Sequence, residues 1–214
     1  MKDKCVLIGD LKNSRKIEKW KKVFSDLEKA LALTNRKYKE AFVIPLKPTI
    51  GDEFQGAIHN PLYSYEIFSY IKSNFNENIY MGIGIGEIEK PFLKEKGMRG
   101  NAFYRARAAI EACKELGHKI IIQSYDEFNN FDLIVNTLLR NIESIENSWT
   151  KRQKEVINFY RFHTNYTYHQ LSKNFKTSKQ AIYEIIKASN WGLIHQNEEA
   201  LTLLLTSGKI ELIK

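Results

Sequence analysis

The order of apolar and polar residues in the first two thirds of the chain predicts alternating short strands and longer helices. Continuous apolar runs of about four to eight residues are typical of buried strands, and apolar residues three and four positions apart are typical of amphipathic helices. We expect Asn13 or Ser14 to cap the first helix. The predicted strands are residues 5–9, 41–46, 54–58, 79–88 and 118–123, and the predicted helices are residues 17–33, 62–74, 102–116 and 126–142.

This element order, βαββαβαβα, predicts an α+β fold. A βαββαβ core is the ferredoxin-like, split-βαβ arrangement, in which a mostly antiparallel sheet carries helices on one face. Gly82, Gly84 and Gly86 alternate along the fourth predicted strand and therefore share one of its faces. We expect a helix backbone to pack closely against that face, and a ligand is the alternative.

A second, small all-α domain is predicted from about Asn147, so the chain divides into residues 1–146 and 147–214. Lys176 and Thr177 form the predicted turn between its second and third helices. The tail EEALTLLLTSGKIELIK then offers an apolar helix followed by a strand or wing, or alternatively a dimer contact. The predicted N-caps of the three short helices are Thr150, Thr167 and Ser178.

Composition indicates an ordinary globular protein. The 214 residues are 43% apolar and 27% charged. No segment has the roughly 20 apolar residues that span a bilayer, and MKDKCVLIGD at the N-terminus lacks the pattern of a signal peptide. Cys5 and Cys113 show no metal-ligand spacing, so we expect reduced thiols and a cytoplasmic location.

Two acidic residues are predicted to meet at one edge of the sheet. Asp10 ends the first strand, and Asp52 lies in the connection between the second and third strands. The first and third strands are central neighbours in a split-βαβ sheet, so these carboxylates should lie close together. Such a pair can hold one or two divalent cations, Mg²⁺ or Mn²⁺, and clamp a phosphate chain. The alternative is that Asp52 is only the turn residue of a Gly-Asp hairpin.

The residues that follow Asp10 are suited to phosphate. Backbone N–H groups at the start of a helix favour anions, and a basic side chain nearby strengthens the contact. We therefore expect a nucleotide or nucleotide-like ligand. The predicted phosphate-binding residues are Lys12, Asn13, Ser14 and Arg15.

Four motifs together resemble the catalytic domain of class III nucleotidyl cyclases. They are GDLKNS, IGD, GIGIGEI and GNAFYRARAA, in this order. The hairpin IGDEFQGAI also resembles the signature hairpin of the GGDEF diguanylate cyclases, and the whole arrangement is similar to the SatD family of small bacterial proteins. The resemblance implies a cyclase-like palm domain with metal ligands at Asp10 and Asp52, to which the GGDEF likeness adds Glu53. The alternative for Glu53 is an exposed residue at the start of a strand.

The sequence departs from the cyclase pattern where the base is read and where catalysis is completed. Pro48 stands where class III adenylyl cyclases place a purine-reading Lys, with Lys47 one residue earlier. Tyr104 and Ala108 stand where those enzymes carry a ribose-orienting Asn and a transition-state Arg. A bound nucleotide is therefore better supported than cyclisation. The remaining catalytic candidates are Arg105 and Arg107, and a solvated helix face is the simpler explanation for both.

The C-terminal pattern resembles a helix-turn-helix of the sigma-region-4 or winged-helix kind over residues 149–190, although Lys176 stands near the usual turn glycine. Residues 147–214 hold 10 Lys and Arg against 5 Asp and Glu, and such a basic surplus favours contact with nucleic acid. The first residues of the second motif helix enter the major groove in such folds. The alternative is a helical protein–protein or dimerisation module. The predicted DNA contacts are Thr177, Ser178, Lys179, Gln180 and Tyr183.

These predictions combine into one leading hypothesis and two rivals. The leading hypothesis is a cytoplasmic, homodimeric regulator of transcription that binds a metal-complexed nucleotide and DNA. In this hypothesis, bound nucleotide shifts the dimer or domain arrangement that contacts DNA. The first rival is an active nucleotidyl cyclase or nucleotidyltransferase that makes a signalling nucleotide and completes its site across a dimer. The second is a structural adaptor with a degenerate palm domain.

Overall fold

The structure is a computed structural model that describes residues 4–49, 51–89, 100–125 and 129–207. The chain divides into two compact units. The sheet unit comprises residues 1–136 and 204–214, and the helical unit comprises residues 137–203. The domain boundary expected near Asn147 coincides with the end of a helix and stays a prediction.

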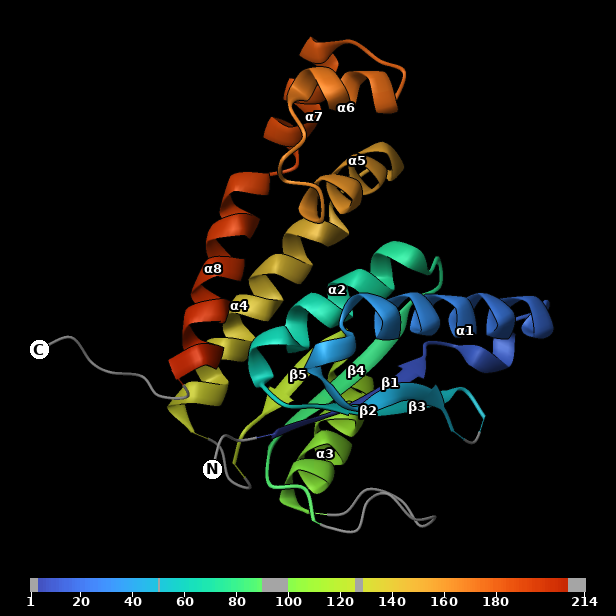
Figure 1. The fold of residues 1–214 in the computed structure, drawn as a ribbon, viewed down its shortest axis with the longest axis vertical. Coiled ribbons are helices and arrows are strands. Elements are labelled where there is room, and N and C mark those ends of the chain that lie inside the picture. The colour runs from blue at the N-terminus through green and yellow to red at the C-terminus, as the bar shows by residue number, and fades with distance from the viewer. Residues whose placement is uncertain (1–3, 50, 90–99, 126–128, 208–214) are drawn as a thin grey trace, which may run out of the picture. The chain divides into compact units, whose positions relative to one another are not determined.

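The described residues form an α+β fold, as predicted, with every predicted strand and helix of the sheet unit present (Figure 1). Short 3-10 helices are labelled η. The elements run in the order β1 (Lys4–Leu11), η1 (Ser14–Lys16), α1 (Trp20–Lys37), η2 (Lys39–Ala41), β2 (Phe42–Pro48), β3 (Glu53–Ile58), η3 (Pro61–Tyr63), α2 (Ser64–Asn74), β4 (Ile79–Gly86), α3 (Asn101–Leu116), β5 (Ile120–Gln123), α4 (Asn130–Asn147), α5 (Lys151–Arg161), α6 (Tyr168–Asn174), α7 (Lys179–Ala188) and α8 (Trp191–Ser207).

The sheet has the strand order β2-β3-β1-β4-β5. β1 is antiparallel to both of its neighbours, β3 and β4, and β2 is antiparallel to β3, which is the split-βαβ arrangement. β5 extends the sheet parallel to β4. The expectation that helices cover one face holds only for α1 and α2, because α3 lies on the opposite face (Figure 1). A parallel pair of strands needs a crossover connection, and α3 is the crossover between β4 and β5.

Glycines in β4 let α3 approach the sheet, as the sequence predicts. A Cβ atom added at Gly82 would lie 2.2 Å from the backbone N of Ile110. A Cβ atom added at Gly84 would lie 2.0 Å from the carbonyl O of Ala102. The α3 backbone therefore occupies the space that side chains would fill. Val6 and Ile8 of β1 complete the buried cluster on this face.

The first helix begins later than the sequence predicts, and neither predicted residue caps it. Asn13 has a left-handed backbone conformation, with φ of 58°, and its side chain makes no capping hydrogen bond. The chain then forms the 3-10 turn η1, and α1 starts only at Trp20. The acidic helix start expected at Asp126 lies outside the described residues, and α4 begins at Asn130.

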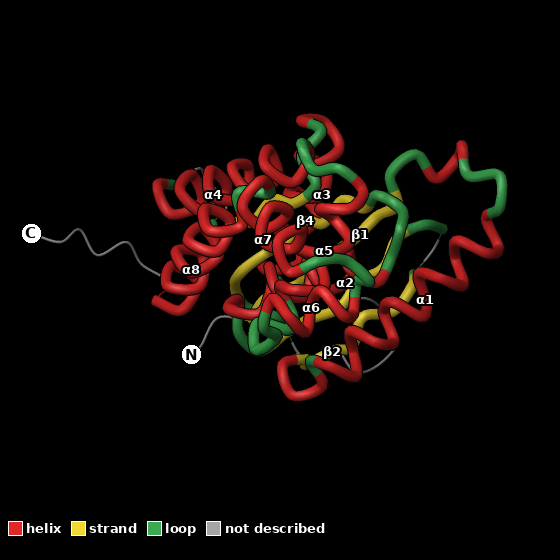
Figure 2. The backbone as a smooth tube through the Cα atoms, turned by 90° about the horizontal axis from the view of Figure 1, so that it is seen from above, coloured by secondary structure: helices red, strands yellow, loops and turns green. Residues whose placement is uncertain are grey.

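The helical unit is built from capped short helices around a buried ion cluster. α8 runs beside α4 in both views of the chain (Figures 1 and 2). Arg161 Nη2 donates to Glu146 Oε1 at 2.8 Å, and Arg161 Nε lies 2.9 Å from Glu198 Oε1.

Among the described residues, no helix combines the length and the apolar character that crossing a bilayer requires.

Candidate functional site

The two acids predicted to meet do meet at one edge of the sheet. Asp10 near the end of β1 is the register partner of Glu53 in β3. The backbone N–H of Leu11 donates to the carbonyl oxygen of Asp52, with an N–O distance of 3.3 Å. Asp10 is buried and Asp52 is half-buried. The β1–β3 pairing therefore brings both carboxylate residues together, and their role as metal ligands stays a prediction.

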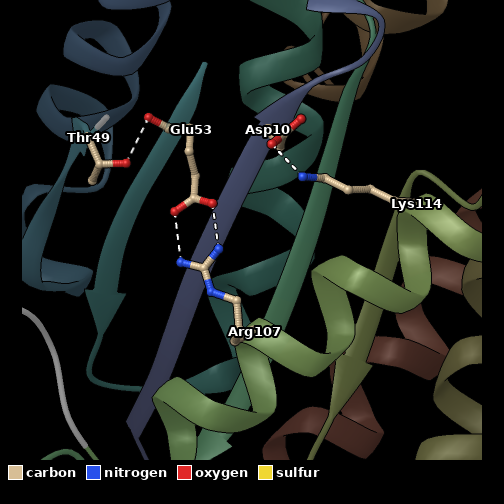
Figure 3. Close-up of polar contacts among 5 residues, drawn as sticks. All are labelled: Asp10, Thr49, Glu53, Arg107 and Lys114. Carbon is tan, nitrogen blue, oxygen red and sulfur yellow. Dashed lines mark hydrogen bonds and ion pairs between the residues drawn. The ribbon is translucent and has the colours of Figure 1, made fainter. Parts of the chain in front are cut away.

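Helix α3 adds two basic side chains to this edge of the sheet (Figure 3). Lys114 Nζ donates to Asp10 Oδ2 at 2.6 Å. Arg107 forms a bidentate pair with Glu53, with N–O distances of 2.5 and 2.8 Å. Arg107 and Lys114 are seven residues apart, and this spacing places them on one stripe of the helix. The glycine-lined packing of α3 on β4 thus fixes where both cations lie.

The pair with Arg107 changes the interpretation of Glu53. The Glu53 side chain is only 17% exposed, so it is not the exposed strand-start residue that one alternative expected. Its bidentate bond to Arg107 also occupies both carboxylate oxygens. Glu53 would have to leave Arg107 to become a metal ligand, and that role stays a prediction.

The electrostatics of the site follow from the burial of acidic groups close to one another. Burial raises the pKa of Asp10 above its usual value, the hydrogen bond and charge of Lys114 oppose that rise, and the carboxylates of Asp52 and Glu53 add to it. The hydrogen bond to Glu53 raises the pKa of Arg107. A buried carboxylate beside other carboxylates favours a bound cation, because the cation relieves their mutual repulsion.

A pocket of about 720 Å³ opens over this edge of the sheet. It brings carboxylate, ammonium, amide, hydroxyl and aromatic groups together. The residues that line it are Asp10, Leu11, Asn13, Ser14, Lys16, Trp20, Gly51, Asp52, Tyr80 and Lys114. Its volume suits a nucleotide-sized ligand.

The predicted phosphate-binding residues lie at or beside this pocket. Asn13 and Ser14 line it. Lys12 Nζ lies 5.2 Å from the centroid of the Tyr80 ring, and Tyr80 is itself a lining residue. The side chain of Arg15 lies outside the described part of the structure. Lys114, Trp20 and Tyr80 are not among the residues predicted from the sequence, although the seven-residue spacing from Arg107 would have indicated Lys114.

The donor set fits a hard divalent cation that keeps part of its hydration shell. Mg²⁺ prefers oxygen ligands and is commonly bound by one or two carboxylates together with waters and substrate phosphates. Asp10 and Asp52 supply two such carboxylates. Among the described residues, no group of three or more His, Cys, Asp and Glu could hold a metal by itself. Binding of a metal at Asp10 and Asp52 stays a prediction.

The two candidate catalytic arginines have different surroundings. Arg107 is tied to Glu53 at the acidic edge. Arg105 donates through Nη1 to the carbonyl oxygen of Ile85 at 2.7 Å, and its guanidinium lies 5.8 Å from the Tyr125 ring centroid. Arg105 does not line the acidic pocket. Of the two arginines, only Arg107 reaches the carboxylates.

The predicted N-caps in the helical unit are confirmed. Thr150 and Thr167 each form a capping box with the Gln three residues later, and the Ser178 side chain accepts a hydrogen bond from the N–H of Ala181. In the turn before Ser178, Lys176 has φ of 49° and adopts the left-handed conformation usually given to glycine.

The start of α7 presents most of the predicted DNA contacts to solvent. Ser178, Lys179 and Gln180 are exposed, Tyr183 is 43% exposed, and Thr177 is half-buried. Such a helix start is accessible to a large partner. DNA binding itself stays a prediction.

Comparison with known proteins supplies a family and a distant structural likeness. The model of the SatD family matches residues 5–205. No curated protein matches the chain. The chain is similar to the structure of a bacterial light-regulated adenylyl cyclase, with 12% sequence identity and a TM-score of 0.41, over 56% of this chain and 74% of that chain. A likeness at that level carries no argument about activity.

Proposed function

The chain belongs to the SatD family, and for this member we propose that the acidic pocket binds a nucleotide complexed with Mg²⁺ or Mn²⁺. The observation that carries the proposal is the meeting of Asp10, Asp52 and Lys114 around one pocket of nucleotide size. Two carboxylates suit the cation, and an ammonium group beside them suits phosphate oxygens.

Each group then has a distinct task. Asp10 and Asp52 hold the cation, which when bound neutralises phosphate charge. Lys114 and Lys16 contact phosphate oxygens, with Asn13 and Ser14 as hydrogen-bonding neighbours. Arg107 keeps Glu53 in place as a neutral pair, which limits the negative charge that a phosphate chain would meet.

The proposal is tested by isothermal titration of the full chain with MgATP and MgGTP. We expect saturable binding that disappears when EDTA removes the metal. Asp52→Asn should weaken binding roughly tenfold or more, whereas Asp26→Asn, at an exposed acid paired with Lys29, should leave it unchanged. Absence of binding in the wild type, or equal affinities of the two variants, would contradict the proposal.

Binding of DNA by the helical unit is a second proposed function. It is supported by the exposed start of α7, the capped helices before it and the left-handed turn at Lys176. Fluorescence anisotropy with a random-sequence DNA duplex tests it. If Lys179 contacts a phosphate, Lys179→Ala should reduce the salt dependence of log K by about one, and Lys29→Ala should not.

The same anisotropy assay tests coupling between nucleotide and DNA. A regulator that responds to nucleotide would change its DNA affinity when MgATP is added, because the ligand favours one state of the chain. An unchanged affinity would rule out the regulatory link while leaving both binding functions intact.

The alternative is an enzyme that makes a signalling nucleotide. The acidic pair favours it, whereas Tyr104 and Ala108, both exposed on α3, replace the residues that cyclases use for ribose and the transition state. Incubation with each nucleoside triphosphate and Mg²⁺ or Mn²⁺, followed by chromatography, decides between the two. Turnover that is lost in Asp52→Ala would favour the enzyme, and intact nucleotides would favour binding alone.

A further inference from the structure

An aromatic residue at the start of α1 lies in the same pocket as the acidic pair. Trp20 is the first residue of α1, is half-buried and lines the pocket with Asp10 and Asp52. Phe24, one turn later, packs beside it, with ring centroids 5.9 Å apart and an angle of 36° between the rings. Part of the Trp20 ring therefore faces the pocket, while Phe24 packs beside it.

The first residues of the hairpin between β2 and β3 do not contribute an aromatic surface to this pocket. Lys47, Pro48 and Thr49 are absent from the residues that line the pocket, within the described ranges. Pro48 has no backbone N–H and no polar side chain with which to read a base edge. The Thr49 hydroxyl donates to the carbonyl oxygen of Glu53 at 3.1 Å. A base in this pocket would thus not meet the side chains of Lys47, Pro48 or Thr49, and the hairpin residues that do line it are Gly51 and Asp52, the latter proposed to hold the cation.

The other aromatic residue of the pocket is less available. Tyr80 lines it, but the ammonium of Lys12 lies over the Tyr80 ring at 5.2 Å from the centroid. A cation over a ring uses the face on which a base would stack. Trp20 is therefore the better platform of the two.

The charge around Trp20 favours a ligand with several phosphates. Residues 12–22 contain six Lys and Arg and a single acid, Glu18. Lys16 from this segment lines the pocket together with Trp20. A polyphosphate would therefore meet positive charge on the side of the pocket where its base meets an aromatic ring.

From these observations we infer that Trp20 stacks on the base of a bound nucleoside triphosphate, and that the site recognises the base by stacking instead of by hydrogen bonds to its edge. The inference rests on the proposed nucleotide function of the same pocket. Stacking tolerates any base because every base has a π-face. The site should therefore favour nucleoside triphosphates over inorganic triphosphate and discriminate little between ATP and GTP.

The experiment compares three ligands by isothermal titration in the presence of Mg²⁺: ATP, GTP and inorganic triphosphate. For the wild type we expect ATP and GTP affinities within about threefold of each other and an inorganic triphosphate affinity roughly tenfold lower, which is about 1.4 kcal/mol. Trp20→Ala and Trp20→Leu should lower the ATP affinity to that of triphosphate without changing triphosphate binding. Trp20→Phe should restore part of the preference, because it keeps an aromatic face.

Triphosphate binding serves as the internal control for folding and for the metal site. A wild type that binds neither ATP nor triphosphate would overturn the proposed function together with the inference. Binding of triphosphate with the ATP preference intact in Trp20→Leu would overturn the inference alone. So would a preference that is lost in Tyr80→Leu and kept in Trp20→Leu, or an ATP affinity that differs from that of GTP by more than a hundredfold.

Discussion

The packing of α3 on β4 makes Gly84→Ala the most informative single substitution in the sheet unit. The added methyl group would lie 2.0 Å from the carbonyl oxygen of Ala102 and 2.3 Å from the backbone N of Ala106. Ordinary contact begins at 3.4 Å, and both neighbours are helix backbone that cannot rotate aside. The helix must therefore move away from the sheet, or the strand must distort.

The expected cost follows from this geometry. Overpacking of a well-packed core costs about 1–3 kcal/mol, and occasionally more. The added methyl group clashes with helix backbone at two points, so we expect Gly84→Ala to lower the free energy of unfolding by about 3 kcal/mol, the upper end of that range. Gly192→Ala is the matched control, because an added Cβ there meets nothing within 4 Å. Gly192 is the second residue of α8, in its first turn, so the control should change stability by no more than about 0.5 kcal/mol.

Urea unfolding followed by far-UV circular dichroism measures both variants, and hydrogen exchange locates the effect. Exchange protection should fall in residues 79–86 and 101–116 of Gly84→Ala. The α3 helix also carries Lys114 and Arg107, so nucleotide affinity should fall as these side chains withdraw from Asp10 and Glu53. Equal stability of Gly84→Ala and Gly192→Ala, with unchanged exchange in α3, would refute the account of how α3 is held.

The remaining predictions concern buried charge. Arg161→Met removes the guanidinium that pairs with the carboxylates of Glu146 and Glu198, which are 7% and 16% exposed, and should destabilise the helical unit by about 3–5 kcal/mol. Lys29→Met, which removes an exposed pair, should cost no more than about 1 kcal/mol. Urea unfolding measures both costs, with Trp149 and Trp191 fluorescence in a Trp20→Phe background reporting the helical unit and far-UV circular dichroism reporting the sheet unit that holds Lys29, and similar costs would count against a buried cluster. The pKa of Asp10 is higher in the folded chain than in the unfolded chain. The contribution of Asp10 to stability is therefore fully present below its unfolded pKa, and it is lost as the pH rises through its folded pKa. Lys114 opposes that rise, so Lys114→Met should move the pKa of Asp10 still higher, as carboxyl ¹³C NMR titration would show, and a lowered or unchanged pKa would contradict the assigned pair. Mg²⁺ affinity should fall as the pH drops through the pKa of Asp10, because the cation needs the charged carboxylate.

The sequence was sufficient to predict features that depend on local pattern and strand order. The split-βαβ element order brings β1 beside β3, and this alone placed Asp10 near Asp52. Alternating glycines predicted the close approach of a helix to β4. Side-chain caps at Thr150, Thr167 and Ser178 follow from local chemistry.

Features that depend on long-range contacts were not predicted. The partner of Asp10 is Lys114, 104 positions away, and it is set by the face on which α3 packs. Glu53 was expected either to be exposed or to bind metal, yet Arg107 from that same helix face holds it. The start of α1 was placed too early because Asn13 takes a left-handed conformation that hydrophobic periodicity does not reveal.

The most direct test of the central claim is electron paramagnetic resonance of Mn²⁺ in the presence of ATP, with wild type and Asp10→Asn compared. The account predicts that the wild type binds Mn²⁺ together with ATP and that Asp10→Asn binds the pair roughly tenfold more weakly or worse. Equal binding of Mn²⁺ by the two proteins, or no bound Mn²⁺ in the wild type, would contradict the assignment of the acidic pocket.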